Sequence, residues 1–406
     1  METVDRRALL AGAGLVGVAA LSRISKAGPL TPPQGVISPT GRTLQQIYDK
    51  IARGGDSGTP EARIPIQGLP SSATALYVIT QPGSYYLTGN VAGVPGMCAI
   101  DVQADHVEIE CDGFTFFGTQ GTLSCIRASS PQRCIGIYDG GFQGWQGLSV
   151  DLGNSADCLV EECWFDSCIG ASPDPTTPPG ICTLGAGGVL YDCDIRECTF
   201  PQVSVGLNGV IEECVCTGGT GGGACYYCAS DCVMEDNFAM NCDGPAFVVG
   251  GKGVVLYNRV CNCVGGADVG GASIVCENDI EVTISSTGNG ITVRGQRCCV
   301  CDNYTGGGGG GGGGIVILVG GDGALIDGNH VVGPGSSAGT VGNGLIFIQQ
   351  GVTRCHVACN RVRGNSTSST FQVPPGNSYG PLAVVTDQGD ISAIPAAGHP
   401  WANFIH

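Results

Sequence analysis

The stretch Cys232-Val-Met-Glu-Asp-Asn237-Phe-Ala239 recurs as Gly253-Val-Val-Leu-Tyr-Asn258-Arg-Val260 and as Ser273-Ile-Val-Cys-Glu-Asn278-Asp-Ile280. The three segments align without gaps on a central asparagine. Six further segments fit the same pattern, and they are centred on Cys163, Cys193, Cys214, Asn303, Asn329 and Asn360. Successive centres lie 20 to 31 residues apart, so a fixed element alternates with spacers of variable length. This arrangement is typical of a solenoid that carries loops on some of its turns.

The pattern inside each repeat predicts a short strand followed by a turn. Every repeat begins with Gly, Ala, Ser or Cys, and Val, Leu, Ile or Met follows two positions later. Residues two apart share one face of a strand, so these positions point into a bore. The central Asn or Cys falls in the turn, where a buried Asn can bond backbone groups and stack on the Asn of the next coil, about 4.8 Å away. A second strand precedes most repeats. We therefore predict an all-β single-chain solenoid, a parallel β-helix of about 11–12 coils.

Length and composition agree with a solenoid and exclude several partners. The chain has 406 residues, and its apolar fraction of 42% argues against disorder. The 70 glycines suit the many tight turns. The formal net charge of −17 makes nucleic acid and anionic membranes unsuitable partners. Beyond the N-terminal region, no segment is long and apolar enough to span a bilayer.

The N-terminus has the pattern of an export signal. Arg6 and Arg7 precede a stretch of about fourteen Ala, Gly, Val and Leu residues, which resembles a twin-arginine signal. An uncleaved anchor is the alternative. We predict a signal over residues 1–27, a Pro/Gly-rich linker over 28–42, and an N-terminal helix and cap over 43–75. The β-helix is expected over 76–363 and a C-terminal cap or latch over 364–406. The protein is expected to be exported to the periplasm, the cell surface or the medium.

The expected cap contains an amphipathic helix over residues 43–53. Leu44, Ile47, Tyr48 and Ile51 recur at helical spacing, with Thr43 as the N-cap. Such a helix would cover the open first coil.

All 24 cysteines lie between Cys98 and Cys359. Many fall on inward repeat positions, where a small soft side chain packs well. Stacked Cys163, Cys193 and Cys214 would also be close enough for bridges between coils. Zinc or copper is the alternative, because four cysteine pairs are closely spaced and could act as half-sites. These are Cys214/Cys216, Cys225/Cys228, Cys261/Cys263 and Cys299/Cys301. We favour buried thiols or disulfides between coils.

Three motifs carry a family resemblance over nearly the whole chain. They are Gly41-Arg-Thr-Leu-Gln-Gln-Ile-Tyr-Asp-Lys-Ile51, Ile79-Thr-Gln-Pro-Gly-Ser-Tyr-Tyr-Leu-Thr-Gly-Asn90 and Pro400-Trp-Ala-Asn-Phe404. Together with the signal and the repeats, they resemble a family of exported right-handed β-helix proteins of planctomycete-type bacteria. That family lies within the pectate-lyase-like superfold, which includes lyases, polygalacturonases, epimerases, tailspikes and non-catalytic binding proteins. The resemblance implies a right-handed helix and no particular activity.

Carboxylates precede the central residue in four consecutive repeats: Glu162, Asp192, Glu213 and Asp236. In register they would form a ladder, for which Ca²⁺ is the candidate cation and a solvated turn face the simpler explanation. No other cofactor is expected. Because its members would lie about 5 Å apart, the ladder could also serve a retaining glycosidase, which needs two carboxyl groups about 5–5.5 Å apart. The candidate catalytic residues are Glu161 and Glu212 together with Glu162 and Glu213. The Asn-Thr-Asp, Asp-Asp and Gly-His-Gly motifs of polygalacturonases are absent.

An apolar stripe is expected on the outside of the helix, at the position after the small residue. Its members are Leu159, Val189, Val210, Val233, Val254, Ile274, Cys299 and Leu325. A terminal segment or a second subunit would have to cover it, and lateral self-association follows in the second case.

The expected function is binding of polysaccharide, or a structural role at the cell envelope, without catalysis. Trp145, Trp164, Tyr226 and Tyr227 could stack on sugar rings, although core packing is the simpler role for each. The alternative function is that of a polysaccharide lyase or glycoside hydrolase acting on an acidic or complex polysaccharide.

Overall fold

The structure is a computed structural model that describes residues 63–170, 180–199, 202–282, 288–307, 314–333, 346–363, 371–385, 394 and 396–405. The chain divides into residues 1–60 and a second unit, Glu61–His406, to which all described residues belong. The predicted signal, linker and helix over 43–53 lie outside the described residues. At the start of the second unit a single 3-10 turn, Ile66–Gly68, follows the first strand.

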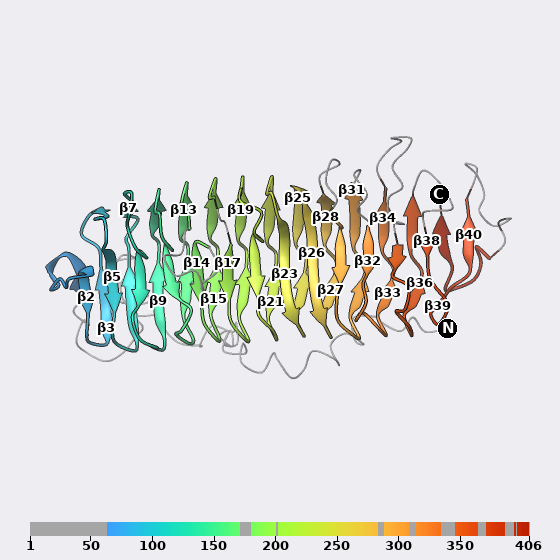
Figure 1. Ribbon diagram of the computed structural model, residues 1–406, viewed down its shortest axis with the longest axis horizontal. Helices are drawn as coiled ribbons and strands as arrows, with labels where there is room; N and C mark the ends of the chain where they lie inside the picture. The colour runs from blue at the N-terminus through green and yellow to red at the C-terminus, as the bar shows by residue number, and fades with distance from the viewer. Residues whose placement is uncertain are drawn as a thin grey trace, which may run out of the picture. The chain divides into compact units, whose positions relative to one another are not determined.

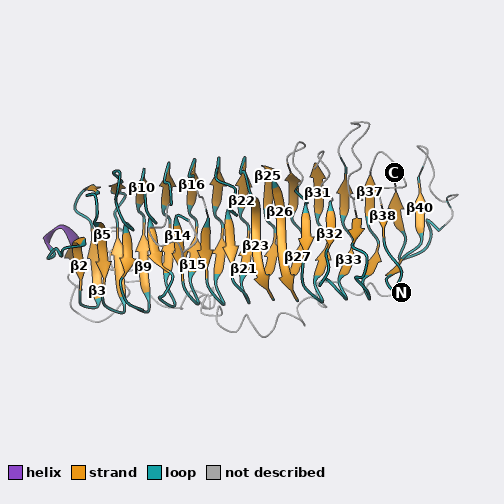
Figure 2. Ribbon diagram, viewed as in Figure 1, coloured by secondary structure: helices purple, strands orange, loops and turns teal. Residues whose placement is uncertain are grey.

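Three parallel sheets run along this unit, and successive strands of the chain enter them in turn (Figure 1). We name them sheets A, B and C. Each turn of the solenoid contributes one strand to B, then one to A, then one to C, and β2 to β37 make about 12 turns. Most of the strands are only three residues long, and they alternate with turns and connections of different lengths (Figure 2). The parallel β-helix predicted from the repeats is thereby confirmed, with three strands in each turn.

Sheet A holds the strands that the repeats predict. Its strands are β1 (Ile64–Pro65), β3 (Gly83–Tyr86), β6 (Val107–Glu110), β9 (Ile135–Tyr138), β12 (Leu159–Glu161), β15 (Val189–Tyr191), β18 (Val210–Glu212), β21 (Val233–Glu235), β24 (Val254–Leu256), β27 (Ile274–Cys276), β30 (Cys299–Cys301), β33 (Leu325–Asp327), β36 (His356–Ala358) and β39 (Ser378–Tyr379).

Sheet B precedes sheet A in every turn. Its strands are β2 (Ala75–Ile79), β5 (Cys98–Val102), β8 (Ile126–Ala128), β11 (Val150–Leu152), β14 (Cys182–Leu184), β17 (Val203–Val205), β20 (Tyr226–Cys228), β23 (Pro245–Gly251), β26 (Gly265–Gly271), β29 (Ile291–Val293), β32 (Ile315–Ile317), β35 (Ile346–Ile348) and β38 (Phe371–Gln372).

Sheet C follows the central Cys or Asn of each repeat. Its strands are β4 (Val91–Ala92), β7 (Thr115–Phe117), β10 (Gly141–Gln143), β13 (Trp164–Asp166), β16 (Asp194–Arg196), β19 (Val215–Thr217), β22 (Phe238–Met240), β25 (Arg259–Cys263), β28 (Asp279–Val282), β31 (Tyr304–Gly307), β34 (His330–Val332), β37 (Arg361–Arg363), β41 (Asn403–Ile405) and β40 (Leu382–Val384).

The core is a column of apolar side chains that fills the bore. The middle residue of each repeat strand in sheet A is buried, as Val160, Leu190 and Ile211 show. On sheet C, Phe116, Phe142 and Phe165 stack, with ring centroids 5.2 and 4.9 Å apart. Alternation along short strands therefore sorts side chains between the bore and the surface, as the period-2 pattern predicts.

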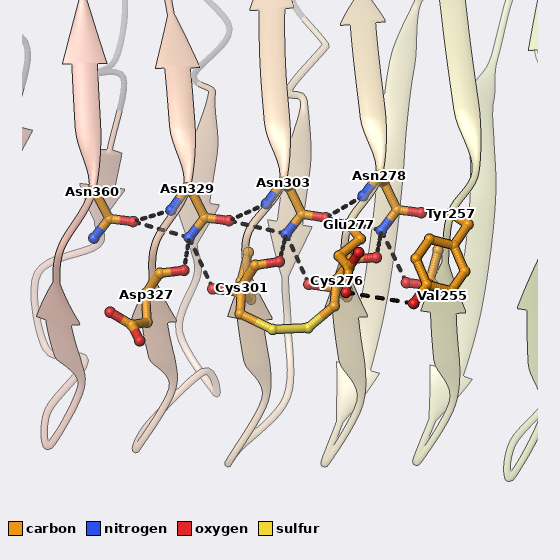
Figure 3. The surroundings of a disulfide bond; sticks show 12 residues. Val255, Tyr257, Cys276, Glu277, Asn278, Cys301, Asn303, Asp327, Asn329 and Asn360 are labelled. Carbon is orange, nitrogen blue, oxygen red and sulfur yellow. Dashed lines mark hydrogen bonds between the residues drawn. A yellow bond between two sulfur atoms is a disulfide. The ribbon is translucent and has the colours of Figure 1, made fainter. Parts of the chain in front are cut away.

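A ladder of buried asparagines lines the turn between sheets A and C, as predicted. The backbone N–H and the side-chain Nδ2 of Asn303 both donate to Oδ1 of Asn329, at 3.1 and 3.0 Å (Figure 3). Nδ2 of Asn303 also donates to the carbonyls of Val275 and Cys301. These bonds satisfy backbone N–H and carbonyl groups that would otherwise be buried without hydrogen-bond partners. The same position holds the buried Cys163, Cys193 and Cys214 in the earlier turns, and Asn237, Asn258, Asn278 and Asn360 in the others.

The ladder and the sheets continue beyond residue 363, where the repeat pattern ends in the sequence. Asn403 extends the ladder, because its Oδ1 accepts from the backbone and side chain of Asn360 at 3.1 and 3.0 Å. Strand β41 pairs with β37, so part of the predicted C-terminal cap forms a further rung of sheet C. Asn360 and Asn403 are 43 residues apart, whereas the other central residues are 20 to 31 residues apart, so the sequence spacing does not indicate this rung.

The apolar stripe is confirmed as one aligned column on the outer face of sheet A. Leu159 pairs with Val189, Val189 with Val210, and the register holds as far as Leu325. Its members are half-buried or exposed. Cover by a terminal segment and cover by a second subunit both stay predictions.

Most cysteines of the described region are free and buried. Cys276 and Cys301, on the outer face of sheet A, form a disulfide between adjacent turns, with Cα atoms 4.8 Å apart (Figure 3). Cys163, Cys193 and Cys214 are free thiols, so the bridge between coils occurs at a different column from the one singled out in the sequence. No helix in the described part of the chain is long and apolar enough to cross a membrane.

Candidate functional site

The predicted carboxylate ladder lies where the sequence places it, at the corner between sheets A and C. Glu162, Asp192, Glu213 and Asp236 are exposed and have positive φ values of 53°, 47°, 54° and 55°. The left-handed conformation lets the chain turn sharply before the buried Cys or Asn. These four side chains therefore occupy equivalent solvent-facing places in successive turns.

These carboxylates do not converge on a common point. Among the described residues, two groups of three or more potential ligands have donor atoms within 4.8 Å of one another, and both groups consist of cysteines. Ca²⁺ binding at the ladder stays a prediction, and it would need neighbouring side chains to rotate toward each other.

Glu161 and Glu212 lie on the outer face of sheet A, but a turn of the solenoid separates them. Glu161 pairs with Tyr191 and Tyr191 with Glu212, which puts the two glutamates about 10 Å apart along the axis. The hydroxyl of Tyr191 donates to Glu213 Oε2 at 3.0 Å. The spacing is too long for the carboxyl pair of a retaining glycosidase. Glu212 instead has Glu235 on the adjacent strand.

Burial raises the pKa of each of these sheet A glutamates. For Glu161, desolvation is the main cause, and the charges of Glu162 and Asp192 add to it. For Glu212, desolvation again leads, followed by Glu213 and Asp236. The pKa of Glu235 is raised by desolvation, then by Glu212 and Asp236. Glu161, Glu212 and Glu235 therefore form an acidic stripe beside the apolar stripe, interrupted by Tyr191, and neighbouring carboxylates compete for ionisation there.

A hollow crosses the corner between sheets A and C. Its volume is about 610 Å³. Its lining spans two consecutive turns and comprises Glu162, Cys163, Trp164, Phe165, Asp166, Asp192, Asp194 and Arg196. Four carboxylates and one guanidinium face this hollow, so its local charge is negative.

Trp164 forms an aromatic platform in the hollow, and its side chain is 36% exposed. The indole lies over Gly141 on the preceding strand, where a Cβ atom would come within 2.2 Å of Trp164 Cζ2. A glycine at position 141 is thus required for the ring to lie against the sheet. Underneath, the stacked rings of Phe142 and Phe165 support the two strands from inside the bore.

Polar groups surround the platform on the neighbouring strands. Asp194 pairs with Trp164 in register, and its Oδ2 accepts from Arg196. Oδ1 of Asp194 is buried and has no hydrogen-bond partner in the described structure. Asp166 accepts from Gln143 Nε2 at 3.2 Å. An aromatic face with hydrogen-bonding groups at its rim suits a sugar ring, which has an apolar face and polar edges.

The structure separates the aromatic residues singled out in the sequence. Trp145 and Tyr226 are buried, so both belong to the core, and Tyr227 is half-buried. Trp164 is the exposed one. Asp166, Asp194 and Arg196 were missed, although their places two residues apart after the central cysteine mark them as outward residues of a strand.

Comparison with known proteins supports the fold. The sequence model of the family described as "Right handed beta helix region" matches residues 135–280. The A-module of the mannuronan C-5 epimerase AlgE6 of Azotobacter vinelandii is similar in structure, with 13% identity and a TM-score of 0.54, over 73% of this chain and 89% of that one. A tailspike protein of the E. coli bacteriophage HK620, solved in complex with a pentasaccharide, has 12% identity and a TM-score of 0.56, over 92% of this chain and 76% of that one. A search of curated proteins found no match.

These similarities define the class of the protein. The described region is a right-handed parallel β-solenoid, as the family resemblance implied. At 12–13% identity the likeness concerns the fold, and the function has to be argued from the site.

Proposed function

We propose that the protein binds a neutral or amino-sugar polysaccharide along the outer face of sheet C, centred on Trp164. The observation that carries this proposal is the exposed indole of Trp164, which lies over Gly141 within a hollow that four carboxylates and Arg196 surround. The fold offers a long outer surface, and two of the similar structures are a mannuronan epimerase and a tailspike with a bound pentasaccharide. Export by the signal expected at residues 1–27 would bring the protein to extracellular polysaccharides.

The charge of the hollow narrows the ligand class. Carboxylates outnumber cations four to one among its lining residues, and Arg196 is already paired with Asp194. A uronic acid polymer would place further negative charge there, at a Coulombic cost. Neutral sugars can donate hydroxyl protons to the carboxylates, and protonated amino sugars gain charge attraction as well.

The carboxylate ladder favours binding without catalysis. Glu162 and Asp192 have equivalent exposed positions in successive turns. A hydrolase needs two carboxyl groups in different environments, so that one is protonated while the other is charged.

A glycoside hydrolase is the second candidate, and the raised pKa values on sheet A favour it. Glu212 and Glu235 are adjacent across β18 and β21, about 4.8 Å apart at their Cα atoms, and burial raises the pKa of both. A carboxyl group that stays protonated can act as a general acid.

The test uses the full chain and a panel of polymers with and without Ca²⁺: a β-glucan, a xylan, chitosan, pectate and alginate. Retention in affinity electrophoresis measures binding, new reducing ends measure hydrolysis, and absorbance of unsaturated ends measures lyase activity. We expect retention on neutral polymers or chitosan without turnover. Retention on pectate and alginate alone would refute the ligand class. New reducing ends that disappear in Glu212→Gln would establish the hydrolase.

A further inference from the structure

Four buried thiols meet inside the bore, away from the hollow. Cys216 lies in the middle of β19, Cys225 immediately precedes β20, Cys242 follows β22, and Cys263 ends β25. All four are buried. They come from three successive turns of the solenoid, on the side where sheet C passes into sheet B.

The distances among these sulfur atoms suit a metal ion. Cys216 Sγ and Cys242 Sγ are 3.8 Å apart, and the sulfur atoms of Cys216, Cys225 and Cys242 all lie within 4.8 Å of one another. The Cys263 thiol interacts with those of Cys225 and Cys242. With Zn–S bonds of about 2.3 Å, the edge of a ZnS₄ tetrahedron is about 3.8 Å long. The three sulfur atoms of Cys216, Cys225 and Cys242 are thus close to the dimensions of a zinc site, and Cys263, which lies outside this 4.8 Å group, would have to approach them.

The cluster differs from the other buried cysteines in how many sulfur atoms come close together. Donation to a backbone carbonyl does not separate the two kinds, because Cys242 and Cys263 also donate to carbonyls. Cys163, Cys193 and Cys214 donate to the carbonyls of Ile137, Val160 and Leu190 in the preceding turns, at 3.7 to 3.9 Å. Cys168 and Cys198 donate in the same way to Phe142 and Phe165. Neighbouring thiols also interact in those columns, as Cys193 does with Cys163 and Cys168 with Cys198. Among the described residues, however, three free sulfur atoms lie within 4.8 Å of one another only in the cluster. Core packing alone does not require this convergence.

The second group of close cysteines is a weaker candidate. It consists of Cys276, Cys299 and Cys301, and two of its three sulfur atoms form the disulfide. That leaves a single thiol to bind a metal.

We propose that Cys216, Cys225, Cys242 and Cys263 bind one Zn²⁺ ion in the bore. The ion would join β19, β22 and β25, so it would stabilise three neighbouring turns against local opening. Each thiol ligand loses a proton to solvent when the Zn–S bond forms, and no oxidant takes part. Zinc affinity should therefore increase with pH.

The chain is first purified in full length under a reducing agent from zinc-supplemented medium. Its metal content is measured by mass spectrometry, and Co²⁺ then replaces Zn²⁺ for absorption spectroscopy. We expect one zinc per chain, thiolate-to-cobalt charge-transfer bands, and a melting temperature that falls when the metal is removed. Zinc-dependent protection from alkylation should map to the four cluster cysteines in partly denatured protein.

Single variants assign the ligands. Cys216→Ser, Cys225→Ser and Cys242→Ser should each weaken zinc binding at least tenfold. Cys193→Ser is the matched control, because Cys193 is equally buried but lies outside the group of close sulfur atoms, and it should retain the metal. If a cluster variant fails to fold, the pattern of zinc-dependent protection from alkylation in the unaltered chain still shows which cysteines bind zinc.

Three results would overturn the proposal. They are an unaltered chain that retains no zinc, a cobalt spectrum without thiolate bands, and protection that maps to other cysteines. A Cys216–Cys242 disulfide in the protein purified without reductant, combined with failure to load zinc after reduction, would identify the cluster as a redox pair instead.

Discussion

Replacement of Trp164 by alanine tests the proposed binding face most directly. The residue is 36% exposed. A tryptophan side chain can bury up to about 250 Å², so a sugar ring can cover about 90 Å² of the indole. At about 25 cal/mol for each Å² removed from water, this contact contributes about 2 kcal/mol. Trp164→Ala should therefore weaken the affinity for the bound polysaccharide about 30-fold, since 1.4 kcal/mol corresponds to a factor of ten.

The assay is affinity electrophoresis or calorimetry with a soluble polymer on which the unaltered chain is retained. Trp401→Ala is the matched control, because Trp401 is 54% exposed and lies in the C-terminal segment, outside the hollow. Its loss should leave the affinity unchanged. Thermal melts of both variants show whether the solenoid stays folded, as expected for an outward side chain whose removal leaves the bore intact.

Two outcomes would show that the reasoning is wrong. Equal losses of affinity in the two variants would indicate a general effect of surface aromatics. An unchanged affinity in Trp164→Ala, with retention intact, would place the binding face elsewhere on the solenoid.

Three further predictions concern the Trp164 platform, the buried asparagine ladder and the acidic stripe on sheet A. Gly141→Ala should reduce binding by displacing the Trp164 ring, whose Cζ2 atom would lie 2.2 Å from the new Cβ, and binding would survive if the ring is not the platform. Asn303→Ala should lower the free energy of unfolding by about 3 kcal/mol in denaturant titrations, because it leaves the Asn278 N–H and a buried carbonyl without partners. Asn303→Cys should cost less, because cysteine occupies this place in earlier turns, and equal costs would contradict a hydrogen-bonding role. Burial raises the pKa of Glu212, so the folded state holds its proton more tightly than the unfolded state does. The resulting stability is complete below the unfolded pKa and is lost as the pH rises through the folded pKa. The melting temperature should therefore fall less with rising pH in Glu212→Gln, and identical pH profiles would refute this.

The fold could be predicted from the sequence because each turn repeats the same local rule. A small residue, an inward apolar residue and a central Asn or Cys define one strand and one corner, and Val160, Val255 and Asn258 follow this rule. The turn made by Asn403 was harder to find, because its spacer is longer than the others. The stripe from Leu159 to Leu325 could also be placed correctly, because alternation decides which residues face outward.

The candidate site could be predicted only in part. Glu162, Asp192, Glu213 and Asp236 were identified from their shared position in the repeat. The proximity of Trp164 to Asp194 and Arg196 was not identified, because Trp164 lies next to them only across stacked strands. Glu161 and Glu212 were both among the candidate catalytic residues, and the structure shows that the turn that carries Tyr191 lies between them.

The sequence by itself determined the solenoid, its buried ladder and the side on which each strand residue lies, because these depend on a two-residue alternation within one turn. The tertiary structure decided which side chains meet. Trp164 over Gly141 and the sulfur cluster around Cys242 join residues from different turns. Their meeting depends on the register between stacked strands and on the path of the corners, where Cys225 and Cys242 lie. Because the spacers have unequal lengths, the sequence does not predict the strand register or the path of the corners. Both sites can therefore be identified only from the stacked turns.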